Sequence, residues 1–472
     1  MSPPVVRYAG LAGSVLLAVA AHLGGVGPVW QPNTEVLDLL RGAHGVVMPL
    51  AWVIGIALLT TAWWAGRHVV PDTRWAYVTA GLWLLPMLLP AVLGSRDIYS
   101  YACQGAVVAA GGNPYTAGPG ELGCPWLEST APIWRDSPAP YGPLFVLLAG
   151  GAAALGGTLA GTLALLRAVA VAGVLLTAVC LPVLAGRAGV PPHRAVWWTL
   201  ACPLVAVHLV SGAHNDAVMV GLLVAGLTVA ATARERWPLL IAAGALLGLA
   251  VAVKATATVV VPFAALVAAG GAGGLRPLLV RGGTVVAGAT AALLAVTVAS
   301  GLGFGWVRGL TRSGDSRQWT SPPTAVGLTV DYLGRVFGGA WHAVPVTRVI
   351  GLVVLAVVLV ALWWRARHGD PLLGAGLALA ATVALSPVFH PWYATWPLAV
   401  LAATWARPSP RRTPWLLVPC AVAAVLVLPD GTSLALVTRL PGALAMTGVV
   451  IVVVVFAVRR ALASRTTEEV AP

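Results

Sequence analysis

The sequence predicts an all-α polytopic membrane protein, a bundle of about 14 transmembrane helices with short interfacial helices on the outer side. Of its 472 residues, 59% are hydrophobic and only 9% are charged, and the mean hydropathy is +0.88. Apolar runs such as 350–364 and 443–458 lack the alternation of a barrel strand, so the spans are expected to be helices.

The first apolar run, at 9–27, is expected to be a retained span rather than a cleaved signal peptide. Ala18-Val19-Ala20 resembles a cleavage site, but Arg7 is the only basic residue before it. Spans and loops then alternate along the whole chain, and two long polar stretches interrupt them at 94–141 and 302–343.

Arginines recur in every second loop of this predicted arrangement. They are Arg67 and Arg74, Arg187 and Arg194, Arg234 and Arg236, Arg276 and Arg281, Arg365 and Arg367, and Arg407, Arg411 and Arg412. This distribution follows the positive-inside rule and predicts a plasma-membrane protein with both termini in the cytoplasm. The net charge of +13 therefore reflects topology, with anionic membrane lipids as the expected partner and nucleic acid excluded.

The stretch 141–187 decides the orientation of everything after it. Two spans there would place Arg187 and Arg194 outside. One span preceded by a Gly-rich interfacial helix at 141–154 keeps the basic loops inside, and we adopt that interpretation.

Both long polar stretches then face outward. The expected organisation is N-terminal transmembrane helices at 1–93, an external loop with interfacial helices at 94–158, a central transmembrane bundle at 159–301, a second external loop at 302–343, and a C-terminal bundle with a cytoplasmic tail at 344–472.

Asp97 is the leading candidate site residue, because a carboxylate at a membrane boundary is costly unless it lines a cavity. It precedes an expected interfacial helix over 98–110, on which Asp97, Ser100, Tyr101 and Gln104 share one face. A carboxylate, hydroxyls and an amide together suit the binding of a polyhydroxylated molecule. The alternative is an interfacial helix cap.

The rest of the first external loop is stiffened by prolines and carries aromatic and charged side chains. Its candidate ligand contacts are Asn113, Tyr115, Trp134, Arg135, Asp136 and Tyr141. For Arg135 and Asp136, ordering of the loop is an equally good interpretation. Cys103 and Cys124 lie in a compartment that permits disulfides, and they either form a bridge or pack as separate thiols.

A second polar cluster opens a later span on the outer face. His214, Asn215 and Asp216 form either a second acidic site or an N-cap favoured by the helix dipole. No spacing of His, Cys, Asp or Glu supplies a metal site, so none is expected.

A third group is cationic, although the outer face is where arginine and lysine should be depleted. Lys254 lies at an outer turn, and Arg308, Arg312 and Arg317 follow in the second external loop. Guanidinium and ammonium groups match phosphate oxygens, so these four predict a phosphate site.

Aromatic residues add to this expected outer face. Trp319 lies in the second external loop, and His390 and Trp392 begin a later span. They are candidates for substrate contact. The alternative for His390 and Trp392 is an interfacial aromatic belt.

Several of these stretches resemble a known group of enzymes. The matching segments are 95–119, 134–145, 209–221, 319–327 and 386–397. They resemble the glycosyltransferase-C superfamily, and more narrowly the actinobacterial polyprenyl-phosphate-mannose-dependent α-1,6-mannosyltransferases of lipomannan and lipoarabinomannan assembly.

The resemblance implies an inverting enzyme that transfers mannose from polyprenyl-phosphate-mannose to a lipid-anchored α-1,6-mannan outside the membrane. Asp97 would be its catalytic residue, Asp216 a second polar site, and Lys254 with the arginines of 302–343 the donor-phosphate site. The superfamily often uses an acidic pair in its first external loop. Here a single acid follows two expected spans, so no metal or other cofactor is expected.

Two alternatives stand beside this interpretation. A transferase of the same superfamily could use another sugar, such as arabinofuranose. A transporter or flippase of lipid-linked sugars would also need many spans and an intramembrane lysine. Against a carrier, the sequence shows no inverted repeat and its polar residues cluster on one expected face.

Overall fold

The computed structural model describes residues 1–29, 44–89, 91–233, 235–270, 274–405 and 413–468, so Arg234 and the arginines at 407–412 lie outside this part. The described residues form helices and two isolated β-bridges, with no strand among them. The predicted all-α class is confirmed.

The helices that build the bundle are α1 (Pro3–Gly24), α3 (Val47–Gly66), α4 (Thr73–Leu84), α7 (Pro143–Gly156), α8 (Leu159–Arg187), α9 (Pro192–Leu200), α10 (Asp216–Ala233), α11 (Trp237–Val253), α12 (Val261–Ala269), α14 (Gly283–Ser300), α17 (Ala343–Ala366), α18 (Pro371–Leu385), α19 (Thr395–Thr404), α20 (Thr413–Ala424) and α22 (Arg439–Glu468). The remaining α-helices are α5 (Asp97–Ala109), α6 (Pro132–Arg135), α13 (Leu275–Pro277), α15 (Trp306–Arg312), α16 (Pro322–Val336) and α21 (Leu434–Val437).

Polar residues begin several of these helices. Asp72 caps α4 by accepting a hydrogen bond from the Trp75 amide at 2.8 Å, and Asp370 caps α18 by accepting from the Leu372 amide at 2.9 Å. Thr158 caps α8 in the same way. Each cap satisfies an amide that has no partner inside its helix.

Seven helices of the described residues are long and apolar enough to cross a membrane, and α9 with the π-helical turn Val205–Ser211 adds an eighth if this bent pair is one span. Five further apolar helices have 10–17 residues, α7 and α11 among them. The expected count of about 14 is therefore not confirmed. Many runs that hydropathy marks as spans fold as these shorter helices.

The stretch 141–187 folds as the 14-residue helix α7 followed by the 29-residue helix α8. Gly157, with φ +62°, ends α7 in the left-handed conformation and allows the turn into α8. Of these two helices, only α8 has the length of a candidate span. The one-span interpretation, with the orientation that depends on it, stays a prediction.

The stretch 302–343, expected to be an external loop, is mostly helical, and its place outside the membrane stays a prediction. It contains α15 and α16, and α16 packs against α17 and α22. Helix α16 starts with Pro322 and Pro323, which are favourable in a first helical turn. Its apolar residues then find partners on the two neighbouring helices.

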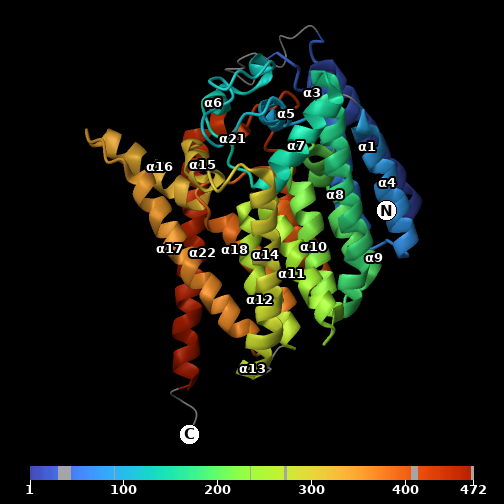
Figure 1. The fold of residues 1–472 in the computed structure, drawn as a ribbon. Helices are drawn as coiled ribbons and strands as arrows, with labels where there is room; N and C mark the ends of the chain where they lie inside the picture. The colour runs from blue at the N-terminus through green and yellow to red at the C-terminus, as the bar shows by residue number, and fades with distance from the viewer. Residues whose placement is uncertain (30–43, 90, 234, 271–273, 406–412, 469–472) are drawn as a thin grey trace.

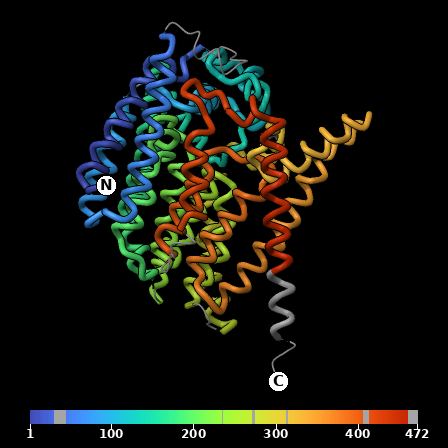
Figure 2. Tube along the Cα trace, turned by 180° about the vertical axis from the view of Figure 1, so that it is seen from behind, coloured from blue at the N-terminus to red at the C-terminus, as the bar shows by residue number. Residues whose placement is uncertain are grey.

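Helices α5, α6, α15 and α21 gather at one end of the bundle, while α13 and the C-terminus lie at the opposite end (Figure 1). Seen from behind, part of the C-terminal region reaches the first end, beside the N-terminal helices, before the last helix runs back toward the C-terminus (Figure 2). The Gly94 amide donates to the Pro429 carbonyl there at 3.1 Å, which joins the two halves.

Helices α16 and α17 extend sideways from the bundle (Figure 1). In their most apolar stretches only 6% of α17 and 11% of α22 is buried, against 72% of α10. The core therefore lies around α10, and α17 and α22 present most of their apolar side chains outward, as contact with lipid requires.

Candidate active site

Asp97 is the first residue of α5, where the helix dipole favours a negative charge. Gly94, with φ +80°, turns the chain just before it, and the Asp97 amide donates to Ser95 Oγ at 3.2 Å. The Asp97 side chain is 18% exposed. The predicted helix at this position is confirmed, and it points its acid at a solvent-connected space.

Two cavities meet at Asp97. The larger, of about 1060 Å³, lies between the end of α1, the loop that carries Trp134 and the C-terminal segment 427–437. The smaller, of about 450 Å³, has Lys254 in its wall. The residues that line both cavities are Asp97, Trp134, His390 and Trp392. A ligand in either cavity can therefore reach the same carboxylate.

Burial raises the pKa of Asp97 from its ordinary 3.8 to about 6. The charge of Lys254 opposes this rise and that of Asp216 adds to it, while hydrogen bonds from Trp134 and Ser95 to the carboxylate lower the pKa. At neutral pH the group is mostly ionised but close to its pKa, which is the condition that suits a general base.

Trp392 is held by two imidazole rings. Its ring stacks with His390 at 4.7 Å and 1°, and with His214 at 3.7 Å and 23°. Burial lowers the pKa of His214 well below its usual range and that of His390 to about 3, so both rings are neutral. They position the wall shared by the two cavities without adding charge to it.

His214 also lies beside Asp97. Its Nδ1 is 3.7 Å from Asp97 Oδ2 and 3.4 Å from the Tyr101 hydroxyl. Because the ring is neutral, this contact is polar rather than ionic. The Tyr101 ring in turn packs edge-on against Tyr141, and burial raises the pKa of both phenols well above the usual range.

Lys254 interrupts the apolar sequence between α11 and α12, and its extended backbone ends α11. Its Nζ lies 2.8 Å from Asp216 Oδ1, which also accepts the Trp396 indole N–H at 2.6 Å. The ammonium group sits 4.4 Å from the Tyr393 ring centroid. A carboxylate partner and two aromatic faces make a largely buried cation tolerable.

His214, Asn215 and Asp216 are all buried, and none of them lines either cavity. Asp216 accepts hydrogen bonds from Lys254 and Trp396. His214 lies beside Asp97 and stacks on Trp392. The predicted second acidic site therefore lies next to the two cavities. Its side chains do not line them, but they contact the residues that do.

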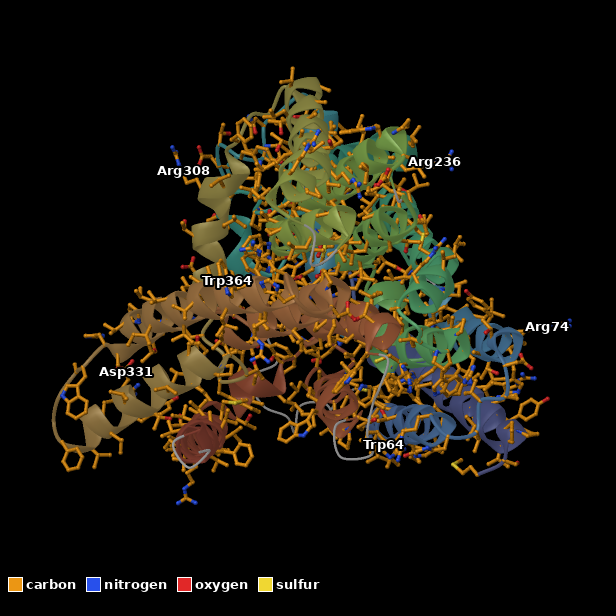
Figure 3. All side chains as sticks on the ribbon, turned by 90° about the horizontal axis from the view of Figure 1, so that it is seen from below. Trp64, Arg74, Arg236, Arg308, Asp331 and Trp364 are labelled. Atoms are coloured by element: carbon orange, nitrogen blue, oxygen red, sulfur yellow. A yellow bond between two sulfur atoms is a disulfide. The ribbon has the colours of Figure 1, made fainter. Side chains whose placement is uncertain are left out.

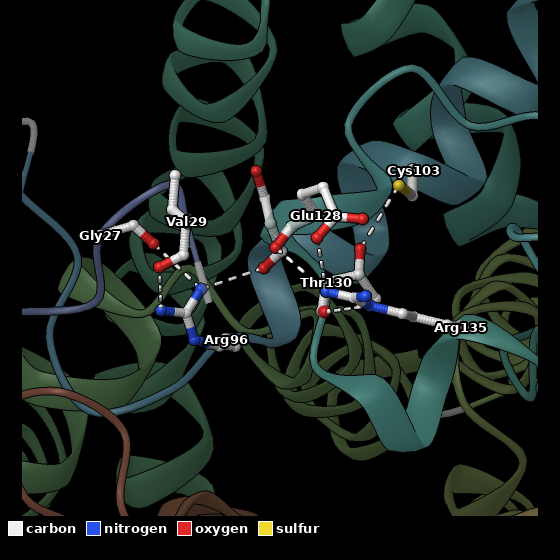
Figure 4. Close-up of polar contacts among 8 residues, drawn as sticks. Gly27, Val29, Arg96, Cys103, Glu128, Thr130 and Arg135 are labelled. Carbon is white, nitrogen blue, oxygen red and sulfur yellow. Dashed lines mark hydrogen bonds and ion pairs between the residues drawn. The ribbon is translucent and has the colours of Figure 1, made fainter. Parts of the chain in front are cut away.

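The loop over the site is tied down by a disulfide and by two arginines. Cys103 and Cys124 form the disulfide, so of the two alternatives for these cysteines the bridge is confirmed. Arg96 donates to the carbonyls of Gly27, Val29 and Ser129, and Arg135 donates to those of Glu128 and Thr130 (Figure 4). Arg135 thus orders the loop, and it does not line a cavity.

Several other predicted contacts also serve the scaffold. Asn113 donates to the Leu302 carbonyl at 3.2 Å, and Tyr115 donates to that of Tyr141 at 2.9 Å. Trp319 donates to Thr438 Oγ1 at 3.0 Å. Gln104 is buried, Asp136 is exposed, and none of these five predicted residues lines either cavity.

The predicted phosphate group of four cations is not brought together around one cavity. Lys254 lines the smaller cavity, whereas Arg308 and Arg317 are exposed and line neither. Figure 3 shows Arg308 pointing away from the body of the protein. The side chain of Arg312 lies outside the described part of the structure.

The structure adds site residues that sequence reasoning missed. Tyr393 and Trp396 line the smaller cavity, and Gln318, Asp430 and Thr432 line the larger one. Tyr393 and Trp396 follow the predicted His390 and Trp392 within four residues. Their closeness in sequence to these two residues could have pointed to them. Asp430 lies in a Pro-Asp-Gly turn far along the chain, and only folding places it near Asp97. No group of three or more His, Cys, Asp or Glu side chains suited to a metal ion occurs in the described ranges.

Comparison with known proteins supports a shared family. Residues 7–270 match the family described as the N-terminal domain of alpha-(1->6)-mannopyranosyltransferase, and residues 323–457 match the MptB C-terminal domain. Alpha-(1->6)-mannopyranosyltransferase A of Mycobacterium tuberculosis is 36% identical over 83% of this chain and 79% of its own length. Alpha-(1->6)-mannopyranosyltransferase B of Corynebacterium glutamicum is 30% identical over 85% of this chain and 73% of its own. No solved structure matches significantly.

The similarity spans both halves of the chain, including the segments around Asp97, Lys254 and His390 that form the two cavities. The relatives are named as transferases, which favours an enzyme over the transporter alternative. The chain belongs to the alpha-(1->6)-mannopyranosyltransferase family of glycosyltransferases, and Asp97 lies where its two cavities meet.

Proposed function

We propose that this protein transfers mannose from polyprenyl-phosphate-mannose to a lipid-anchored α-1,6-mannan on the outer face of the plasma membrane. The names of its relatives, alpha-(1->6)-mannopyranosyltransferases, support the sugar and the linkage. The observation that carries the proposal is that Asp97 lines both cavities. A transferase must bring two substrates to one proton acceptor, and this carboxylate is placed to serve both.

The smaller cavity is the proposed donor site. The cation among its lining residues is Lys254, which suits a phosphate, and Leu352 and Val388 give it an apolar side. Leu352 belongs to α17, the helix that is least buried among the span-length helices. A prenyl chain would leave the cavity along this apolar side, toward lipid.

The larger cavity is the proposed acceptor site. Its wall carries hydroxyl, amide and carboxylate groups, and it also includes the indole rings of Trp134 and Trp392. Aromatic surfaces together with a few directed polar groups are typical of specific small-molecule sites. In this arrangement a sugar hydroxyl in the larger cavity faces the donor across Asp97.

The proposed chemistry is a single displacement. Asp97 takes the proton from the acceptor hydroxyl. At the same time, the oxygen of that hydroxyl bonds to the anomeric carbon of the donor mannose, and the bond from this carbon to the phosphate oxygen breaks. The leaving polyprenyl phosphate is stabilised by the Lys254 ammonium group. One inversion converts a β-linked donor into the α-linked product.

The test is transfer itself. Membranes that contain the protein, supplied with labelled polyprenyl-phosphate-mannose and an α-1,6-oligomannoside, should form a labelled product extended by one mannose. The control is the Asp136→Asn variant, because Asp136 is an exposed carboxylate of the same loop and lines neither cavity. It should keep full activity.

Product formation from polyprenyl-phosphate-arabinose but not from the mannose donor would overturn the sugar assignment. Movement of the donor across the bilayer without a new glycosidic bond would overturn the assignment as a transferase.

A further inference from the structure

Part of the wall of the larger cavity is formed by two segments, 316–318 and 430–433, that the chemistry at Asp97 does not use. Residues 427–433 form a turn closed by a β-bridge between Val427 and Ser433, with Gly431 at φ +90°. Because Gly94 donates to the Pro429 carbonyl at 3.1 Å, this turn is docked directly beside the segment that leads to Asp97.

Five side chains make this polar wall, which is defined as Ser316, Gln318, Asp430, Thr432 and Ser433. They hold one another in place. Ser433 Oγ donates to Gln318 Oε1 at 3.4 Å, Gln318 Nε2 donates to Ser316 Oγ at 3.2 Å, and Thr432 Oγ1 donates to an Asp430 carboxylate oxygen at 2.8 Å.

The polar wall lies outside the membrane-length helices and comes from two segments that are distant in sequence, one before α16 and one before α21. It combines hydroxyl groups, which both donate and accept hydrogen bonds, with an amide and a carboxylate. Sugar hydroxyls also donate and accept, so a wall of this composition matches a carbohydrate better than an apolar lipid or a phosphate.

The size of the cavity indicates how much carbohydrate it holds. At about 1060 Å³ it lies just above the range of roughly 300–1000 Å³ that is usual for ligand pockets in proteins. The reacting hydroxyl occupies only the edge at Asp97, so room and hydrogen-bonding groups remain for further sugar units.

We propose that the polar wall is a separate acceptor subsite that binds a sugar unit preceding the one that reacts. Its ligand is an oligohexoside of at least two units, and the wall sets the preference for acceptor length. This inference rests on the proposed function, since it concerns the acceptor of that reaction. Asp97 supplies the chemistry, whereas the wall supplies affinity for the longer chain.

The test compares acceptors of increasing length in variants of the polar wall. Gln318→Leu and Ser433→Ala should each raise the KM for an α-1,6-mannotetraoside about 2- to 12-fold, the equivalent of one net hydrogen bond. The kcat for that acceptor should stay unchanged, and so should the KM for a methyl mannoside, because its single sugar unit is the one that reacts at Asp97.

Matched controls remove similar groups away from the cavity. Thr447→Val deletes a hydroxyl that bonds to Thr329, and Ser300→Ala deletes one at the end of α14. Both should leave the KM for either acceptor at the wild-type value. Asp430→Asn is a third wall variant that preserves shape, and thermal unfolding of each purified variant identifies any that misfold.

An equal rise in KM for the short and the long acceptor in both variants, or no rise for either acceptor, would overturn the subsite while leaving the transferase assignment intact. A loss confined to kcat would do the same, because it would mean that the wall acts on the chemical step. Failure of the wild-type protein to extend any acceptor would instead overturn the proposed function and this inference together.

Discussion

Lowering the pH should switch off transfer by protonating Asp97. Its pKa of about 6 leaves about nine-tenths of the carboxylate ionised at pH 7 and about one-tenth at pH 5. A base must be ionised to accept a proton, so kcat/KM should fall about tenfold between these values. With the ordinary pKa of 3.8, kcat/KM would lose less than about a tenth of its value between pH 7 and pH 5.

The structure also predicts how this acid limb moves. Trp134 donates a hydrogen bond that stabilises the ionised carboxylate, so Trp134→Phe should raise the pKa of Asp97 and shift the limb to higher pH. A net hydrogen bond of about 0.5–1.5 kcal/mol corresponds to a shift of roughly 0.4 to 1.1 pH units. Trp126→Phe is the matched control, because Trp126 lies in the same loop and lines neither cavity.

The assay is the initial rate of mannose transfer by membranes between pH 4.5 and 8, at acceptor concentrations below KM. Under this condition the rate reports kcat/KM and therefore the ionisation of the free enzyme. A rate that stays constant down to pH 5 would refute Asp97 as a base with a raised pKa. An acid limb that is the same in Trp134→Phe and wild type would refute the hydrogen bond.

Four further predictions follow from the same structure. Asp97→Asn should lower kcat at least about 100-fold while the protein stays folded, and retention of a tenth of the wild-type rate would exclude the base. Lys254→Met should destabilise the protein by about 3–5 kcal/mol, because it leaves the buried Asp216 unpaired. The double variant with Asp216→Asn should recover thermal stability but not donor affinity, and recovery of both would exclude the phosphate role. Single cysteines at Gly120 and Gly186 in a cysteine-free background should be labelled by an impermeant reagent only at Gly120, and labelling at Gly186 would reverse the topology. Transfer should survive EDTA, and loss of activity that returns with Mg²⁺ would show a metal requirement.

Much of the site could be predicted from sequence because its members break a strong pattern. In a chain this apolar, a charged side chain is costly unless it has a function or a partner, so Asp97, Lys254 and Asp216 stand out. All three lie at or directly behind the cavity walls. The same rule selected too many residues in the segment 302–343. Arg308 is exposed there, so its charge carries no such cost and needs no function.

The loop residues could not be sorted by sequence, because a directed polar group looks the same whether it binds a ligand or a backbone carbonyl. Trp134 lines both cavities while Arg135, its neighbour, bonds to carbonyls of its own loop. Both residues lie on the short helix α6, so which of them faces the cavity depends on how that helix is oriented. The sequence around it does not specify this orientation.

The sequence by itself determined the membrane class, the helical fold, the family resemblance and the choice of Asp97 as the leading candidate residue. Each of these follows from local composition and short motifs. Only the tertiary structure decided that Asp97 lies between two cavities, that Asp216 pairs with Lys254, and that Asp430, far along the chain, lines the larger cavity. Such contacts join residues up to several hundred positions apart. They depend on how whole helices pack, and hydropathy and spacing along a chain carry no information about that packing.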